Sequence, residues 1–97
     1  MTKNYVTPKL IEKEQLEGMK FPGSDVLHSA ESKKLRADNI ERAMRLGNNF
    51  KGKVKIIFED MEGLKQVETT VWGFTDKRVL LKRDLVIPIH CIHEVNI

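Results

Sequence analysis

The spacing of apolar residues changes at Gly52, and this change limits the folds that the chain can adopt. Before Gly52, apolar residues recur every three or four positions, as they do along one side of a helix. After it, Val54, Ile56 and Phe58 occupy every second position, as they do in a half-buried strand. The sequence therefore predicts one helix followed by a series of short strands.

The expected helix has recognisable ends. Ser29 is a favourable N-cap residue, and Gly47 is of the type that commonly follows the last turn of a helix. Between them, Ala37, Ile40 and Met44 fall on one apolar stripe that can face a core. We expect a helix from about residue 29 to residue 47.

The strands should be short and separated by turns. We expect them at residues 53–60, 66–74, 79–83, 85–89 and 89–97. Pro88 cannot donate a hydrogen bond to a sheet, so it should mark an edge or a break between the last two. About five strands at this spacing are typical of a small antiparallel barrel or sandwich.

The first 27 residues differ from the rest of the chain. They contain Pro8, Gly18, Pro22 and Gly23, with no sustained apolar period. We therefore expect a partly ordered, irregular N-terminal arm at residues 1–27, followed by one domain at residues 28–97. A chain of 97 residues has room for no more than one domain of ordinary size. The predicted fold class is mainly β (α+β).

The stretch IPIHCIHEVNI combines two histidines with the only cysteine and raises the question of a metal or catalytic site. On an extended strand, His90 and His93 project from opposite faces, and Cys91 with His93 supplies too few ligands for a closed zinc site. Cys91 lies among isoleucines and is expected to be buried and inert. The chain has no glycine-rich phosphate loop and no nucleophile motif. We expect no enzymatic activity, no catalytic residue, no metal ion and no cofactor.

Positive charge is concentrated in the middle of the chain. Residues 28–58 carry eight basic and three acidic side chains, whereas the whole chain has a net charge of +3. The basic side chains are Lys33, Lys34, Arg36, Arg42, Arg45, Lys51, Lys53 and Lys55. Such a basic face can contact the phosphates of a nucleic acid, although a solvated helix beside a solvated strand gives the same count.

Exposed aromatic rings would strengthen a nucleic-acid interpretation, because single-stranded bases stack on them. Trp72, Phe74 and Tyr5 are candidates, whereas Phe50 and Phe58 are expected to lie in the core. Trp72 has two further readings, as part of the core or as an anchor for a protein partner.

The order of elements resembles that of the Sm-like small β-barrel superfamily, in particular its bacterial, Hfq-like members. The stretches GLK (63–65), GFTDKRVLLK (73–82) and IHCIHEV (89–95) carry the resemblance. It implies an SH3-like or Sm-like barrel preceded by a helix, with binding of single-stranded RNA by rings of subunits. His90 matches the histidine of the family's base pocket, whereas Pro88 and Ile89 stand where the family has a tyrosine and a lysine.

Two functions are therefore open. The first is binding of single-stranded RNA or another nucleic acid through the basic helix and strand, with Trp72 or His90 at a base. The second is a protein-interaction module, in which the apolar C-terminal strand also pairs between subunits of a homo-oligomer. No apolar run is long enough to span a membrane, and no secretory signal is evident, so we expect a cytoplasmic protein.

Overall fold

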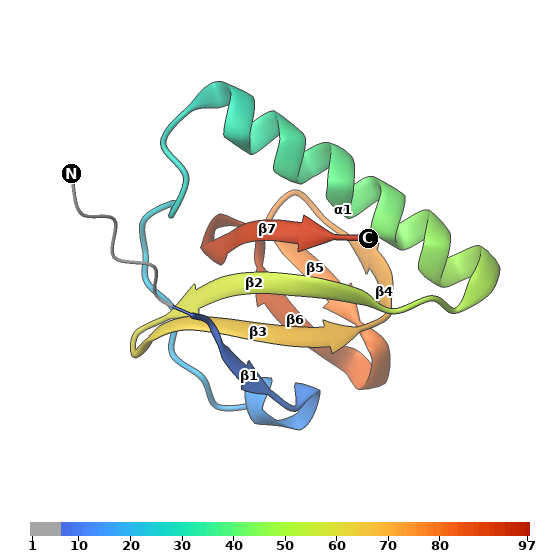
Figure 1. The fold of residues 1–97 in the computed structure, drawn as a ribbon, viewed down its shortest axis with the longest axis horizontal. Coiled ribbons are helices and arrows are strands. Elements are labelled where there is room, and N and C mark those ends of the chain that lie inside the picture. The colour runs from blue at the N-terminus through green and yellow to red at the C-terminus, as the bar shows by residue number, and fades with distance from the viewer. Residues whose placement is uncertain (1–6) are drawn as a thin grey trace.

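The computed structural model describes residues 7–97 (Figure 1). Tyr5, one of the predicted stacking residues, lies outside this range, as does the beginning of the predicted arm. The described elements are β1 (Lys9–Ile11), η1 (Lys13–Leu16), α1 (Ala30–Phe50), β2 (Val54–Asp60), β3 (Gly63–Thr69), β4 (Val71–Phe74), β5 (Arg78–Leu81), η2 (Lys82–Asp84), β6 (Leu85–Pro88), η3 (Ile89–Cys91) and β7 (Ile92–Asn96). The predicted mainly β, α+β class is confirmed.

The strands of residues 7–97 form two sheets. The first has the strand order β1-β3-β2-β7, and the second has the order β4-β5-β6. Strand β1 pairs with β3 in parallel, and the other pairs are antiparallel. Within the described chain neither sheet closes on itself. The strands outnumber the predicted five because the arm contributes β1 and the predicted strand 66–74 is divided at Thr70.

The division at Thr70 carries the chain from the first sheet to the second. The backbone N–H of Lys82 donates to the carbonyl of Thr70 at 3.2 Å, which ties this bend to the end of β5. A second departure from the prediction lies at residues 89–91. They form the short 3-10 helix η3 instead of a strand, because the chain must turn from β6 into β7, and β7 pairs with β2 in the other sheet.

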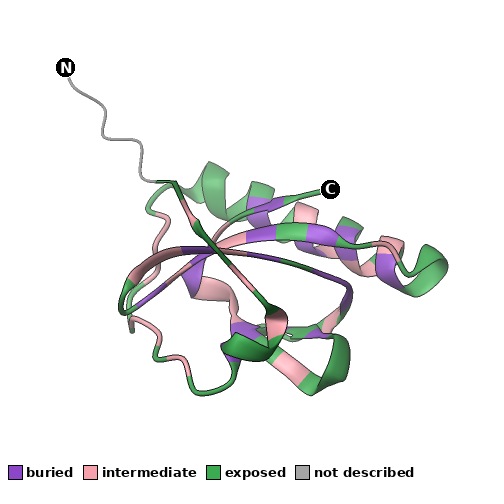
Figure 2. Ribbon diagram, turned by 60° about the horizontal axis from the view of Figure 1, so that its bottom comes forward, coloured by how far each residue is buried: buried purple, intermediate pink, exposed green. Residues whose placement is uncertain are grey.

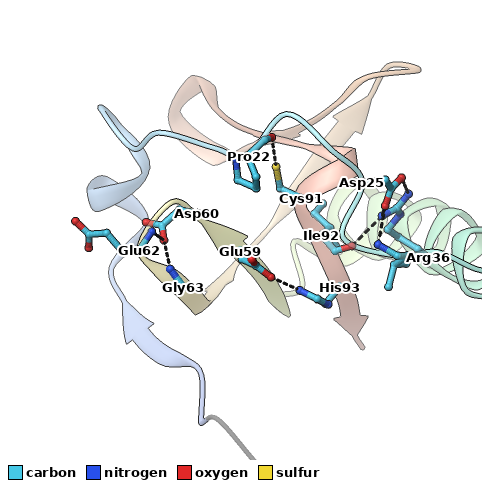
Figure 3. A network of polar contacts seen from close by, with 11 residues as sticks. Pro22, Asp25, Arg36, Glu59, Asp60, Glu62, Gly63, Cys91, Ile92 and His93 are labelled. Atoms are coloured by element: carbon cyan, nitrogen blue, oxygen red, sulfur yellow. Dashed lines mark hydrogen bonds and ion pairs between the residues drawn. The ribbon is translucent and has the colours of Figure 1, made fainter.

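The turn between β2 and β3 has the sequence DMEG, residues 60–63, and is held by its aspartate. Asp60 Oδ1 accepts hydrogen bonds from the backbone N–H groups of Glu62 and Gly63 at 2.9 and 3.0 Å (Figure 3). The buried Lys65 ammonium donates to the same oxygen at 2.8 Å. Burial alone raises the pKa of Asp60, but these donors together hold it below its usual value.

Helix α1 begins where the sequence predicts and ends later. The Ser29 hydroxyl accepts a hydrogen bond from the Ser32 N–H at 3.0 Å, which confirms the N-cap. The helix continues past Gly47 to Phe50, and Lys51 caps it in the left-handed conformation, with φ of 54°. The predicted end at Gly47 is wrong, because this glycine serves a close contact. A Cβ at Gly47 would lie 2.2 Å from the carbonyl oxygen of Val71 in β4.

The helix packs against one strand of each sheet, β4 and β7, and the core lies beneath it (Figures 1 and 2). Its buried positions are Arg36, Ile40, Ala43 and Gly47. Phe58 of β2 is fully buried, as predicted. Phe50 was predicted to be in the core but is 76% exposed, because it lies beyond the last buried turn of α1.

The arm is attached to the core within the described residues. Leu16 of η1 is buried in the core cluster, and the Phe21 ring lies 6.1 Å from the Phe58 ring between centroids. Leu10, by contrast, is exposed on the edge strand β1. Within residues 7–97, no helix combines the length and the apolar character needed to cross a membrane.

Candidate functional site

Arg36 does not belong to the solvent-facing basic surface. Its side chain is 6% exposed, and its two terminal nitrogens donate to the carboxylate oxygens of Asp25 at 2.9 and 2.8 Å (Figure 3). One of them also donates to the carbonyl of Ile92 in β7 at 3.0 Å. The prediction that Arg36 is part of an exposed basic face is therefore wrong: the residue lies on the buried stripe of α1, one turn before Ile40.

This pairing changes the ionisation of Asp25. The hydrogen-bonded Arg36 guanidinium lowers the pKa of Asp25 from 3.8 to about 2, against the opposing effect of burial. Asp25 Oδ1 also accepts from the Leu27 N–H at 2.8 Å. The pair joins the arm, the helix and β7 at one point and is structural.

The other predicted cations of the helix are exposed, and two of them have acidic neighbours. Lys34 pairs with Asp38 at 3.2 Å, and Arg45 pairs with Glu41. Lys33 and Arg42 pair with no carboxylate among the described residues. Exposed pairs of this kind are weak, so all four side chains remain available to an anion, but they do not surround a common point.

Lys55 is separated from the other predicted lysines by its acidic neighbour. It lies directly opposite Glu68 of β3 and Asn96 of β7 on the exposed face of the first sheet. Glu94 faces the neighbouring Ile57 on the same sheet. Lys55 is therefore part of a mixed-charge surface and not of a basic stripe.

Lys51, Lys53 and Trp72 do come together. They line a groove of about 400 Å³ with Asn48 and Lys82, over a floor formed by Gly47 and Thr70. We call it the Trp72 groove. Trp72 is 54% exposed, which excludes its reading as a core residue. The described residues that line the groove contribute three ammonium groups, an amide and an indole, and no carboxylate.

The groove exists because three distant segments converge there. The contact between Gly47 and the Val71 carbonyl brings the end of α1 onto β4 beside Trp72. The left-handed conformation of Lys51 then turns the chain back toward β2, which places Lys53 at the rim. The hydrogen bond from Lys82 to Thr70 brings the end of β5 to the same point. Lys82 and Asn48 were not predicted as site residues, because no local pattern distinguishes them from ordinary exposed residues.

His90 lies in η3 and is held by a backbone group. Its Nε2 lies 2.6 Å from the carbonyl oxygen of Pro22, so this nitrogen carries the proton and donates. Lys77, Arg78 and His90 line a second groove, of about 520 Å³, whose wall also includes Pro88, Ile89, Asp76, Asp25 and Arg36. We call it the His90 groove. It does not contain Trp72, so the two predicted base-contacting residues lie at different sites.

Cys91 and His93 have structural partners. Cys91 is fully buried, its thiol donates to the Pro22 carbonyl at 3.6 Å, and burial raises its pKa to about 11 (Figure 3). A thiol in that state is a poor nucleophile, as predicted for an inert cysteine. His93 Nε2 lies 2.9 Å from Glu59 Oε1. Among residues 7–97, no group of three or more histidine, cysteine, aspartate or glutamate side chains is placed to hold a metal ion.

Comparisons of the chain with protein-family models, with curated proteins and with solved structures gave no match.

Proposed function

We propose that this protein binds single-stranded nucleic acid, with RNA as the first candidate, at the Trp72 groove. The observation that carries the proposal is the half-exposed indole of Trp72 among Lys51, Lys53 and Lys82, with no carboxylate in the lining. A base stacked on such a ring contributes about 1–3 kcal/mol, and lysines bind the flanking phosphates without regard to sequence.

The geometry favours a single strand over a duplex. The Trp72 ring can stack only on a base whose face is free, and the bases of a duplex are already stacked on each other. The three lysines lie around one ring and not along a long stripe, so they match the phosphates beside one or two bases. Lys34, Arg42 and Arg45 on the helix would add weaker, long-range attraction.

We also infer that the two sheets are the halves of one small, partly open barrel of the SH3-like or Sm-like kind. Two features support this inference. The bent segment β3–β4 runs through both sheets, and η3 leads from β6 of one sheet directly into β7 of the other. The helix α1 then covers the side where the edge strands β4 and β7 lie. Another small, partly open barrel, the OB-fold, binds oligonucleotides on its strands and loops.

The proposal predicts a graded loss of affinity in two groove variants. We expect Trp72→Ala to weaken binding of a fluorescein-labelled single-stranded RNA about tenfold, because it removes one stacked base. Lys53→Gln should lower the slope of log affinity against log salt by about 0.7, as one phosphate contact is lost. Fluorescence anisotropy at low and moderate salt, with single-stranded DNA and a duplex alongside, measures both.

Lys55→Gln is the matched control, because Lys55 is also an exposed lysine but lies outside the groove. It should bind RNA nearly as the unmodified chain does. Equal losses for Lys53→Gln and Lys55→Gln would mean that binding depends only on overall charge. Absence of binding at low salt would exclude the proposed function.

A protein-interaction role is the second candidate. The observation in its favour is that β7 is the outer strand of the first sheet, so its outer edge pairs with no strand among the described residues. Pairing of this edge with a second copy would give a homo-oligomer. Light scattering across a range of protein concentrations would detect it as a rise in mass, independent of RNA.

Lys51 provides a separate test, because its backbone is strained. A non-glycine residue in the left-handed region costs about 1–2 kcal/mol, part of which glycine recovers. We therefore expect Lys51→Gly to raise the free energy of unfolding by about 0.5–1 kcal/mol and, at the same time, to weaken RNA binding. Urea denaturation and anisotropy measure the two effects.

Lys51→Ala separates the two contributions. It removes the same charge but keeps the positive φ, so it should weaken RNA binding equally without raising stability. A Lys51→Gly variant that gained stability and bound RNA normally would remove Lys51 from the binding site. A lysine at a position where glycine would be more stable is expected when its side chain contributes to binding.

A further inference from the structure

Strand β5 joins the two grooves. Its residues alternate between exposed and buried, so Arg78 and Leu80 point outward from the second sheet. Arg78 lines the His90 groove at one end of the strand. Lys82, which follows the strand, lines the Trp72 groove at the other end. The two grooves therefore lie at opposite ends of one strand.

The surface between the two grooves is apolar and has no side chain at Gly73. Leu80 lies opposite Gly73 of β4 on one side and Val86 of β6 on the other, and both Leu80 and Val86 are more than one-third exposed. Gly73 has no side chain. A Cβ at this position would have Leu80 as its nearest neighbour, at 3.7 Å. Trp72 precedes Gly73 at the irregularity in the pairing of β4 with β5, between Val71 and Gly73.

Between the two grooves, the exposed face of the second sheet carries no carboxylate. On the face that Arg78 and Leu80 share, β4 contributes Gly73 and β6 contributes Val86 and Pro88, and none of these residues carries a carboxylate. Phe74 lies opposite the buried Val79 and is not on this face. The acidic residues lie at the ends of the path: Asp76 and Asp84 are in the connections that flank β5, and Asp76 and Asp25 line the His90 groove beside Arg78. A polyanion with apolar faces, such as a single strand of nucleic acid, matches a surface of cations separated by apolar side chains.

We infer that the Trp72 groove and the His90 groove are the two ends of one binding track, and that a single nucleic-acid strand lies along β5 and fills both. This inference rests on the proposed function and adds the His90 groove to the binding site. From Arg78 to Lys82 the chain advances four residues, or about 13 Å. At a stacked spacing of about 3.4 Å per nucleotide, that length takes about four nucleotides. A dinucleotide can fill only one end.

The test compares oligonucleotides of two lengths with variants at each end of the track. For a labelled hexanucleotide, both Trp72→Ala and Arg78→Gln should lower affinity, by about tenfold and about threefold to tenfold. For a dinucleotide, measured by competition, Trp72→Ala should still lower affinity, and Arg78→Gln should leave it unchanged. Leu80→Ser in the middle should weaken the hexanucleotide alone. Thermal unfolding of each variant checks that these exposed substitutions leave the fold intact.

The outcomes separate the inference from the proposed function. If Trp72→Ala weakens the hexanucleotide while Arg78→Gln does not, the Trp72 groove acts alone and the track is overturned. If Arg78→Gln weakens both lengths equally, its effect is general attraction and not a contact at the far end, which also overturns the track. If no oligonucleotide of either length binds at low salt, the proposed function fails together with the inference.

Discussion

Replacing Gly47 by alanine is expected to destabilise the protein by at least about 2 kcal/mol, although the same change inside most helices is stabilising. Alanine improves helix propensity by about 1 kcal/mol. Here, however, its Cβ would lie 2.2 Å from the Val71 carbonyl oxygen and 2.9 Å from Cγ2 of Thr70. Val71 is paired with Leu81 of β5, so its carbonyl cannot move without disturbing the second sheet. The helix must therefore shift outward, and overpacking of this kind costs about 1–3 kcal/mol or more.

The consequence should extend to the proposed site. Moving the end of α1 displaces Asn48 and Lys51 from Trp72, so RNA affinity should fall in the molecules that still fold. The melting temperature should fall by roughly 10 °C, since 1 kcal/mol corresponds to about 4–8 °C for a domain of this size. Calorimetry measures this shift, and anisotropy measures the affinity.

Asn49→Ala is the matched control for helix propensity. Asn49 is exposed on the same turn and has no contact of this kind, so alanine there should be neutral or stabilising by about 0.5 kcal/mol. If Gly47→Ala were also stabilising, the helix would have to lie farther from β4 than the structure has it. The same result would remove the reason for the convergence of Lys51 and Trp72.

The local elements were predictable because their signals are local. Ser29 can cap a helix through its own hydroxyl, and the alternation of Val54, Ile56 and Phe58 reflects a strand with one buried face. The turn at Asp60–Gly63 needs only an aspartate that accepts from the following backbone and a glycine at positive φ. Each of these features depends on residues a few positions apart.

The end of the helix was not predictable in the same way. Gly47 looks like the end of a helix, since glycine is common there, and only the distance to Val71 reveals its other use. Lys51, which does cap the helix, carries no signal, because lysine seldom adopts the left-handed conformation. A glycine can thus be required by a contact with a residue 24 positions away, and the sequence around the glycine does not reveal that contact.

The candidate site shows the same limit. Lys51, Lys53 and Trp72 belonged to the predicted set, but they were predicted for separate reasons, as two basic residues and one aromatic ring. Lys82 was missed because residues 59–97 contain more acidic than basic side chains, so their average charge hid a local cluster. That cluster forms only when the bend at Thr70 brings the end of β5 to the end of α1. Basic residues that are distant in sequence form one cluster in the folded chain, and the net charge of a segment does not reveal such a cluster.

The burial of Arg36 was indicated by its spacing in the sequence, but the usual exposure of arginine favoured the opposite prediction. Arginine is usually exposed, which favours a surface role. Its position, however, precedes Ile40, Ala43 and Gly47 by four, seven and eleven residues, which is the spacing of one helix face. The same spacing predicts that Arg36 is buried and needs an acidic partner, which Asp25 of the arm supplies.

Asp25→Asn is therefore expected to be strongly destabilising, by about 3 kcal/mol, because it leaves the guanidinium of Arg36 buried without a counter-charge. The asparagine keeps an oxygen for the Leu27 N–H, so the local turn is preserved and the loss reports the ion pair. Urea denaturation at neutral pH measures it. Against a total stability of about 5–15 kcal/mol for a chain of this length, the loss is large.

Arg36→Met is the informative comparison. It removes the buried charge together with a guanidinium Nε that has no hydrogen-bond partner among the described residues. The Asp25 carboxylate that remains is 27% exposed and can be solvated, so Arg36→Met should cost less than Asp25→Asn. The variant carrying both changes should be close to Arg36→Met alone. Binding of a dinucleotide, which fills only the Trp72 groove, should be unchanged in Arg36→Met, since Arg36 does not line that groove.

The pH dependence of stability gives an independent check on the same pair. The pKa of Asp25 is lowered in the folded protein, from 3.8 to about 2, so the folded state binds this proton less readily than the unfolded chain does. The stabilisation by the pair is therefore complete above about pH 4 and is lost as the pH falls toward 2. Asp25→Asn cannot show this component, so its stability should fall less steeply over that interval than that of the unmodified chain. Parallel curves for the two proteins would mean that Asp25 is not held by Arg36, and that the buried guanidinium draws its counter-charge from elsewhere.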